Sequence, residues 1–432
     1  MPPLPREWCQ CRLGDVVSLT RGVSWSKADE ADDGTPVIAI PNVTEQGINL
    51  DFRYRLSKRI SREKRVAPGD LLLVGASGGI HNVGRSAEVP QCNVDLAFAS
   101  FLVKVVPRGE AVLKEFLPFL VSRGSLRYDY CVKQAADGKF NLQVGELADY
   151  QVLLPPLPEQ RAIARALKAV QAARDARRRE LELERERKAA LMERLFTKGT
   201  RGEPTKMTEI GEMPESWEVV ELGALCGSGG WVQTGPFGSQ LHASDYRDTG
   251  IPVVNPTHLR ENDVDESQLP RISPDRAHQL KRYSLDEGDI LISRRGDFGR
   301  YSLVSGHRAG WLGGTGCLIV RIRSVSVSNG FVALYIGTRA AQDYLMRQSV
   351  GTTMPNLNIR ILRALKVPLP SVEEQMDVVQ ALELALMASV ALRREIALLD
   401  ELFKALLQEL MTGRLSAVGL IEGGTAEPNG GE

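Results

Sequence analysis

Three arginines stand among glycines in the segment SRRGDFGR, which carries Arg294, Arg295 and Arg300. Arginine forks and the backbone amides that glycine leaves accessible can hold phosphate groups and the edges of nucleobases. The segment ASGGIHNVGR offers related groups earlier in the chain: Ser77, His81, Asn82 and Arg85. We therefore expect both segments to be DNA-contacting loops, with an ordinary charged hairpin as the alternative.

Two further pairs of candidates lie in polar turns. The segment QTGPFGSQ supplies Gln233, Thr234, Ser239 and Gln240. The segment GTTMPNLN supplies Thr352, Thr353 and Asn356, and DGKFNLQ supplies Lys139 and Asn141 at matching places. The alternative for these turns is a structural role before a core strand. The residue types suit base readout and phosphate contact but do not say which base is read.

Motifs for catalysis are missing from the sequence. An N-P-P-Y/F motif, needed to grip an exocyclic amine, is not present, because Asn255-Pro256 continues with Thr257. Gly138-Lys139 lacks the upstream glycine of a phosphate-binding loop. The histidines and the six scattered cysteines show no metal-ligand spacing, so no metal site is expected. These features favour a protein with no catalytic activity of its own.

Composition sets the class of protein. The chain has 432 residues, 43% of them hydrophobic, and zero formal net charge. It is long enough for two or three domains with sizeable cores. Its start does not resemble a secretory signal, and we expect no segment that crosses a membrane. Unpaired cysteines suit a reducing compartment, so a cytoplasmic location is expected.

An internal repeat organises the elements that must position these loops. Pro5, Trp8, Leu13 and Gly14 recur 209 residues later as Pro214, Trp217, Leu222 and Gly223. From Gly84-Arg85, matched by Gly299-Arg300, the offset is 215 and needs no further gap. Glu159-Gln160 thus falls on Glu374-Gln375. Because chance similarity does not keep register this long, the chain is a duplication.

Each repeat begins with a β-rich part and ends in a long helix. Short apolar runs such as PVIAI and DLLLV are bounded by glycine, proline, asparagine and aspartate, as strands are. Helices are expected around 111–124 and 331–347. The sequence predicts an α+β fold with two pseudo-symmetric α/β domains, separated by two long antiparallel coiled-coil helices. The expected boundaries are 1–155 for the first domain, 156–200 for the first spacer helix, 201–370 for the second domain, 371–412 for the second spacer helix and 413–432 for a flexible tail.

A ladder of positions with coiled-coil spacing runs along each helix. In the second helix it includes Val378, Leu382, Leu392, Ile396, Leu399, Phe403, Leu406 and Leu410, and in the first Ile163, Leu167, Val170, Leu181, Leu191 and Leu195. Residues 157–200 have a net charge of +5, and residues 371–412 have −5. Opposite charges favour pairing of the two helices within one chain. The alternative is two separate homodimerising coiled coils.

The motifs in this order resemble one known family. LPPLPEQRAIA and LPSVEEQMDVV at the helix starts, WVQTGPFGSQLHASDYRDTGIPVVNP, PGDLLLV and EGDILIS are similar to those of specificity subunits of type I restriction–modification systems, over residues 5–412. The resemblance implies two target-recognition domains that read an asymmetric bipartite site in double-stranded DNA. The first repeat departs from it, because RGVSWSKADEADDG stands where the second has the TGPFGS segment.

The resemblance also implies partners. Two methyltransferase subunits would hold S-adenosylmethionine and methylate adenine N6, and restriction–translocase subunits would use ATP and magnesium, with no cofactor bound by this chain. Two alternatives remain: a specificity module of a type II-like methyltransferase–nuclease, and a protein scaffold that does not bind DNA. The recognised sequence, its spacer length and the activity of the system are not readable from the residues.

Overall fold

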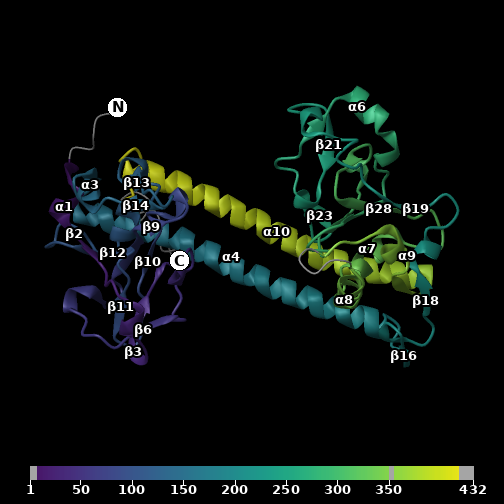
Figure 1. Cartoon of the computed structure of the whole chain (residues 1–432), viewed down its shortest axis with the longest axis horizontal. Helices are drawn as coiled ribbons and strands as arrows, with labels where there is room; N and C mark the ends of the chain where they lie inside the picture. The colour runs from purple at the N-terminus through teal and green to yellow at the C-terminus, as the bar shows by residue number, and fades with distance from the viewer. Residues whose placement is uncertain (1–6, 350–354, 418–432) are drawn as a thin grey trace, which may run out of the picture. The chain divides into compact units, whose positions relative to one another are not determined.

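The computed structural model describes residues 7–349 and 355–417 and divides the chain into two compact units. The first unit comprises Met1–Arg178 with Arg394–Glu432, and the second comprises Arg179–Arg393. Two long helices, α4 (Leu157–Lys198) and α10 (Val372–Met411), each continue from one unit into the other (Figure 1). The helices run within the ranges 156–200 and 371–412 that the sequence predicts for the spacers.

Two four-stranded sheets form the body of the first unit. One has the order β10-β8-β12-β2, built from Ser86–Glu88, Leu71–Val74, Leu102–Pro107 and Val17–Arg21. The other has the order β6-β3-β11-β7, built from Tyr54–Leu56, Glu30–Ile38, Leu96–Phe98 and Arg65–Val66. Strands β1 (Cys9–Arg12) and β15 (Gln151–Leu154) pair beside them. Apolar residues of β8 and β12 are buried on both sheet faces, which explains their continuous apolar runs.

The second unit repeats this topology. Its sheet β26-β25-β28-β19 comprises Tyr301–Leu303, Ile290–Ser293, Cys317–Arg321 and Trp231–Thr234. A second sheet, β20-β24-β21-β27, comprises Tyr246–Arg247, Arg271–Ile272, Ile251–Val254 and Leu312–Gly313. Strands β18 (Glu218–Glu221) and β29 (Lys366–Leu369) pair as β1 and β15 do. The predicted α+β class is therefore confirmed.

The helices that interleave with the sheets differ between the units. The second unit has α7 (Asn329–Ile336) and α8 (Arg339–Gln348), whose N-termini are capped by the hydroxyls of Ser328 and Thr338. In the first unit, the helix predicted around 111–124 is wrong in extent, because only α2 (Leu117–Leu120) forms there. Pro118 has no N–H to donate, and Val121 leaves helical geometry at the end of this turn.

The Glu-Gln pair of each repeat joins a domain to its helix. Glu159 accepts a hydrogen bond from the Trp8 indole at 2.7 Å, and Glu374 accepts one from the Trp217 indole at 3.1 Å. The amide of Gln160 bonds the backbone of Ala111, Leu113 and Pro155, and that of Gln375 bonds Ser326, Ser328 and Pro370. A buried glutamine with all these bonds made fixes the direction of the helix start. This geometry explains why the motif occurs twice.

Within the first unit, the start of α4 packs antiparallel on the end of α10. Ile163 and Leu167 share a core with Leu407 and Leu410, and Ala417 just beyond α10 is buried in the same core. Farther along, Arg174 Nη1 lies 3.2 Å from Asp400 Oδ1, and Arg177 Nε lies 2.8 Å from Glu395 Oε2. Basic α4 thus meets acidic α10, as the opposite net charges predict. The predicted tail is described only for residues 413–417.

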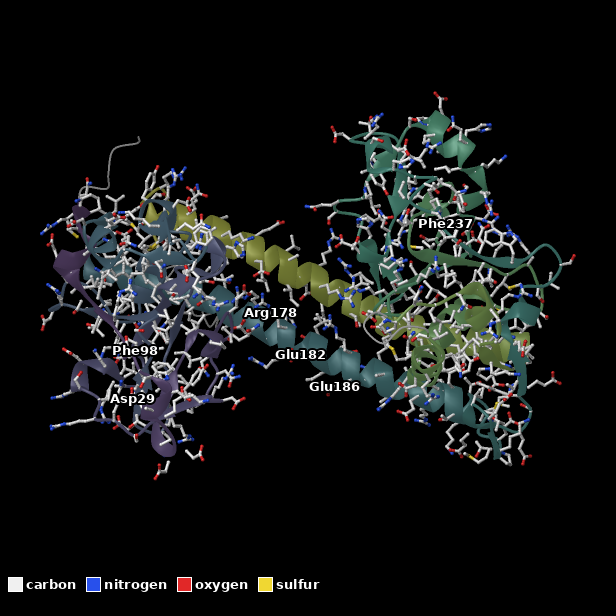
Figure 2. All side chains as sticks on the ribbon, viewed as in Figure 1. Asp29, Phe98, Arg178, Glu182, Glu186 and Phe237 are labelled. Carbon is white, nitrogen blue, oxygen red and sulfur yellow. The ribbon has the colours of Figure 1, made fainter. Side chains whose placement is uncertain are left out.

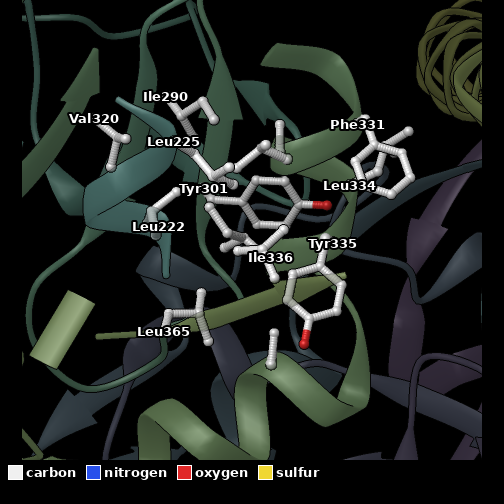
Figure 3. Close-up of a cluster of buried hydrophobic side chains, with 14 of the residues drawn as sticks. Leu222, Leu225, Ile290, Tyr301, Val320, Phe331, Leu334, Tyr335, Ile336 and Leu365 are labelled. Carbon is white, nitrogen blue, oxygen red and sulfur yellow. The ribbon is translucent and has the colours of Figure 1, made fainter. Parts of the chain in front are cut away.

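Within the second unit, the end of α4 packs on the start of α10. Met192, Leu195 and Phe196 share a core with Val378 and Leu382. Figure 3 shows part of this core, in which the ring of Tyr301 lies among aliphatic side chains. Gly337 must lack a side chain, because a Cβ there would lie 2.1 Å from the Tyr301 hydroxyl. Helix pairing within the chain is therefore confirmed for each unit.

The ladder positions of both helices are buried or half-buried, but their partners differ from the expected ones in one place. The polar middle of α4 does not only face α10. Lys188, which is 5% exposed, extends its ammonium group to Glu261 Oε1 of the second β-rich domain, at 2.7 Å. A buried ammonium needs such a partner. Lys188 lies between Leu181 and Leu191 of the first ladder, so this contact supplies a partner for a buried polar residue in that stretch of α4.

Helix α10 is also apolar outside its ladder. Among the described residues it is the one helix long and apolar enough to cross a membrane, with an 18-residue window of mean hydropathy 1.3. The expectation that no segment crosses a membrane stays a prediction, because α10 meets this test by length and composition only. The core helix of a soluble domain passes the same test, so this finding alone is weak support for a membrane span.

Candidate nucleic-acid interface

Two of the predicted loops meet in the second unit. The loop after β19, which contains Pro236 and Phe237, lies across a cavity of about 400 Å³ from Arg294 and Arg295, at the end of β25. The Arg294 guanidinium carbon lies 6.0 Å from the centroid of the Phe237 ring, which is 52% exposed and is labelled in Figure 2. Thus the structure brings together candidates that are about 60 residues apart in the sequence.

Backbone contacts hold the first of these loops in place. Gly235 donates to Cys317 O at 2.8 Å, and a Cβ at this glycine would lie 2.1 Å from Gly314 O. Farther along, Gln240 Oε1 accepts hydrogen bonds from Phe237 N at 3.1 Å and from the Tyr283 hydroxyl at 2.7 Å. The glutamine therefore shapes the loop from within.

Gln233 and Ser239 complete the candidates from this segment. Gln233 donates to Arg282 O at 2.6 Å, so its amide, like that of Gln240, already has a partner inside the domain. Thr234 lines the cavity, and Ser239 is exposed. Of the four predicted residues, Thr234 and Ser239 are placed where a ligand could reach them.

The second loop is tied to the segment around Asn356. Leu357 N donates to Arg294 O at 2.9 Å, and Arg294 Nε donates to Leu357 O at 3.1 Å. Arg295 pairs with Asn356 in an isolated antiparallel bridge. The Asn356 side-chain oxygen is buried and accepts no hydrogen bond from the described residues. Asn356 thus lies beside both arginines.

Two more candidates from the second unit lie elsewhere. Arg300 is paired with Asp297 at 3.3 Å and lines a separate cavity with Tyr301. Thr352 and Thr353 lie outside the described residues.

In the first unit, the corresponding candidates gather around a small sheet. Strand β9 (Ala76–Ser77) pairs with β14 (Phe140–Leu142), which places Ser77 opposite Phe140 and Asn141 opposite Ala76. Lys139 Nζ lies 2.9 Å from Asp137 Oδ2 in the turn that precedes β14. The sheet brings Ser77, Lys139 and Asn141 into one neighbourhood.

His81 and Asn82 lie in the short helix η4 (Ile80–Asn82) of the next loop. The Arg85 guanidinium donates to Asn82 Oδ1 at 3.4 Å. This loop is four residues longer than its counterpart. Val74 N bonds Arg85 O in the first unit, and Ser293 N bonds Arg300 O at the equivalent place in the second.

Strand register reveals which loop positions correspond. Arg21 pairs with Val103, and Thr234 pairs with Leu318, the residue that matches Val103 at the offset of 215. Gly22 therefore corresponds to Gly235, and each would clash with an equivalent strand through a Cβ. From here to the equivalent turns at Ser26 and His242, the second unit has three additional residues. The weak match of the first repeat to the TGPFGS segment is thus a shorter loop.

The two units use arginines from different segments to bond equivalent backbone carbonyls. In the first unit, Arg21 donates to Leu142 O at 2.6 Å, and in the second unit Arg294 donates to the equivalent Leu357 O. The same carbonyl is thus held by an arginine from β2 in one unit and from the end of β25 in the other. Comparison of the two repeats did not single out Arg21, because Arg21 aligns with Thr234. The arginine that makes the equivalent bond in the second unit, Arg294, lies 60 residues after Thr234.

Comparison with known proteins decides the family. A model described as the type I restriction modification DNA specificity domain matches residues 5–185 and 214–395. The chain belongs to the family of type I restriction–modification DNA specificity subunits. It is a non-catalytic DNA specificity subunit, and its two matches correspond to two target-recognition domains with their helices.

Relatives align over nearly the whole chain. The putative MjaX specificity subunit of Methanocaldococcus jannaschii is 24% identical over 95% of this chain and 94% of its own length. The EcoBI specificity subunit of Escherichia coli is also 24% identical, over 95% and 86%. The crystal structure of a type I S subunit from M. genitalium aligns with a TM-score of 0.55 at 13% identity, over 95% of this chain and 97% of that one. The likeness of that structure supports the same fold.

Within residues 7–349 and 355–417, no group of three or more histidine, cysteine, aspartate or glutamate side chains is placed to hold a metal ion. Burial raises the pKa of the Cys317 thiol to about 12, so this cysteine is protonated at neutral pH and is not a nucleophile.

Proposed function

We propose that this specificity subunit reads an asymmetric bipartite site in double-stranded DNA, one half-site with each target-recognition domain. The observation that carries the proposal is the contrast between equivalent loops on equivalent frameworks. The sheets β10-β8-β12-β2 and β26-β25-β28-β19 have the same strand order, whereas the loop after β19 is three residues longer in the second domain and the loop after β8 is four residues longer in the first. Equal frameworks with unequal loops suit two readers of different sequences.

The proposal includes the partners of a type I complex. Two methyltransferase subunits would bind S-adenosylmethionine and methylate adenine N6, and restriction–translocase subunits would use ATP and magnesium. Helix α10 offers a surface for the methyltransferase, because Met376, Leu384 and Met387 in the second unit are 62–68% exposed. Exposed apolar side chains on one helix favour a protein partner. Such a complex would act on DNA in the cytoplasm.

Methylome sequencing of a host with and without the gene tests the function. With the methyltransferase partner expressed throughout, we expect N6-methyladenine at one bipartite motif only when the specificity subunit is present. The purified subunit alone should neither methylate nor cleave DNA. A methylome that does not change with the gene would contradict the proposal. Cleavage at a fixed short distance from the site would instead favour a type II-like methyltransferase–nuclease.

A further inference from the structure

The cavity between the Pro236–Gly238 loop and the two arginines at the end of β25 has a more specific use. We propose that it holds one phosphodiester group of the DNA backbone with the adjoining deoxyribose. Arg294 and Arg295 then position the duplex on the second domain and do not read a base. This inference rests on the proposed DNA recognition and adds the class of DNA group that the cavity takes.

Unpaired positive charge is the first argument. Among the described residues, neither Arg294 nor Arg295 has a carboxylate partner, whereas the nearby Asp297 is paired with Arg300. Arg308 and Arg321 of the same domain, by contrast, are each paired with acidic side chains. Two cations without a counter-charge on one cavity wall favour an anionic ligand.

Hydrogen-bond donors are the second argument. Besides the arginines, the residues that line the cavity include Thr234, Thr315, Gly235, Gly238 and Gly316. The amides of Gly238, Thr315 and Gly316 donate to no acceptor in the described part of the chain. No asparagine, glutamine, aspartate or glutamate lines the cavity. Phosphate oxygens accept hydrogen bonds only, so this set of donors matches them.

Reading a base would call for a different lining. The major-groove edges of adenine and cytosine present amino groups, which need carboxylate or amide oxygens as acceptors. Base-reading side chains also protrude into a groove, whereas this site is recessed. Arg294 is further restricted, because its Nε already donates to Leu357 O and its guanidinium lies over Phe237. The convex backbone of the duplex suits a recess better than a base edge does.

The apolar wall accounts for the rest of the volume. About 400 Å³ is more than one phosphate group fills, and Pro236, Phe237 and Pro256 border the remainder. A deoxyribose ring offers a C–H face that packs on such side chains. In the first domain the loop is three residues shorter and Arg21 is bonded to two backbone carbonyls. The contact is therefore specific to the second half-site.

Salt dependence of DNA binding tests the inference. The specificity subunit is assembled with its methyltransferase partner, and the affinity of the complex for DNA is measured by fluorescence anisotropy. One duplex carries the motif defined by the methylome and the other a scrambled sequence, and KCl is varied from about 50 to about 300 mM. Variants are Arg295→Gln, Arg295→Lys and the control Arg339→Gln. Arg339 is an exposed arginine of the same unit, lies 3.8 Å from Asp343 and does not line the cavity.

For Arg295→Gln we expect the slope of log K against log [salt] to fall by about 0.9, the value for one lost phosphate contact. Affinity for both duplexes should fall by a similar factor, roughly tenfold. Arg295→Lys should restore most of the affinity, because lysine serves a phosphate as a point charge but cannot reproduce a bidentate base contact. The methylated motif should stay the same in every variant.

Three results would overturn the inference. The first is a slope for Arg295→Gln equal to that of Arg339→Gln, which means that no phosphate contact was lost. The second is a loss confined to the motif duplex, or a changed methylome motif, which means that Arg295 reads a base. The third is failure of the unmodified complex to bind DNA, which overturns the proposed function together with this inference.

Discussion

At the residue scale, the two domains use different side chains to make the same turn. Ala39 N donates to Asn42 Oδ1 at 2.9 Å in the first domain, and Asn255 N donates to His258 Nδ1 at 3.1 Å in the second. The histidine must be neutral to accept this bond. Desolvation lowers the pKa of His258 below its usual value, which keeps the ring neutral. Replacement of asparagine by histidine thus makes one turn sensitive to acid.

Replacing His258 with asparagine should remove this sensitivity. The pKa of His258 in the folded state lies below the unfolded value of about 6.5, so the unfolded state binds the proton first as pH falls. The stability contributed by neutral His258 is therefore fully present above about pH 6.5 and is lost as pH falls through the folded-state pKa. The difference in melting temperature between His258→Asn and the unmodified chain should shift in favour of the variant from pH 6.5 to 5. The linked slope cannot exceed about 1.4 kcal/mol per pH unit. A difference in melting temperature that stays the same at every pH would refute this prediction.

At the element scale, α10 carries two apolar faces. One packs on the cores of the two units through Val378, Leu382 and Leu410. The other leaves Leu384 68% exposed and Met387 65% exposed in the second unit. The amino-acid pattern alone does not distinguish them, and the same apolarity makes the helix long and apolar enough to cross a membrane. In the proposed complex, the methyltransferase subunit would cover the exposed face.

Met387→Glu tests this contact. We expect at least about a tenfold loss of methyltransferase affinity, because a carboxylate at a protein interface loses hydration without gaining a partner. Folding should change little, since the side chain is exposed. The matched control is Met207→Glu in strand β16 (Thr205–Thr208), where the methionine is 78% exposed. Co-purification and calorimetry measure the effect, and equal affinity for the two variants would contradict it.

At the scale of the whole molecule, α4 and α10 are the two long helices that continue from one unit into the other. Their lengths of 42 and 40 residues are nearly equal. Ion pairs join them in the first unit, among them those from Arg174, Arg177 and Arg178 to Glu395 and Asp400. The helices therefore pair as basic and acidic partners within one chain. We propose that they set the number of unread base pairs between the half-sites.

Adding four residues to both helices tests that role. Insertions between Arg178 and Arg179 and between Arg393 and Arg394 lengthen each helix by about 6 Å. The unread spacer in the methylome should lengthen by about two base pairs, with both half-sites unchanged. Insertion into α4 alone is the control, because it breaks the register with α10 and should reduce activity. An unchanged spacer in the variant with both insertions would disprove the proposal that the two helices set the spacer length.

Much of this specificity subunit follows from the amino-acid sequence alone. The duplication, the α+β class, the ladders of the two helices and the recurrence of the Glu-Gln pair depend on local periodicity and on motifs that repeat at a constant offset. Such signals come from near neighbours, so they survive without knowledge of the tertiary structure. The predicted helix around 111–124 is too long, because Pro118 has no N–H to donate and Val121 leaves helical geometry after a single turn.

Only the tertiary structure decided which side chains meet. Arg21 and Arg294 hold equivalent carbonyls from different strands, Gln233 and Gln240 turn inward to the backbone, and Phe237 faces Arg294 across a cavity. These contacts depend on strand register and on loop lengths that differ by three or four residues. Segments 60 or more residues apart meet only when the sheets form, and a one-residue change of register would bring other side chains together.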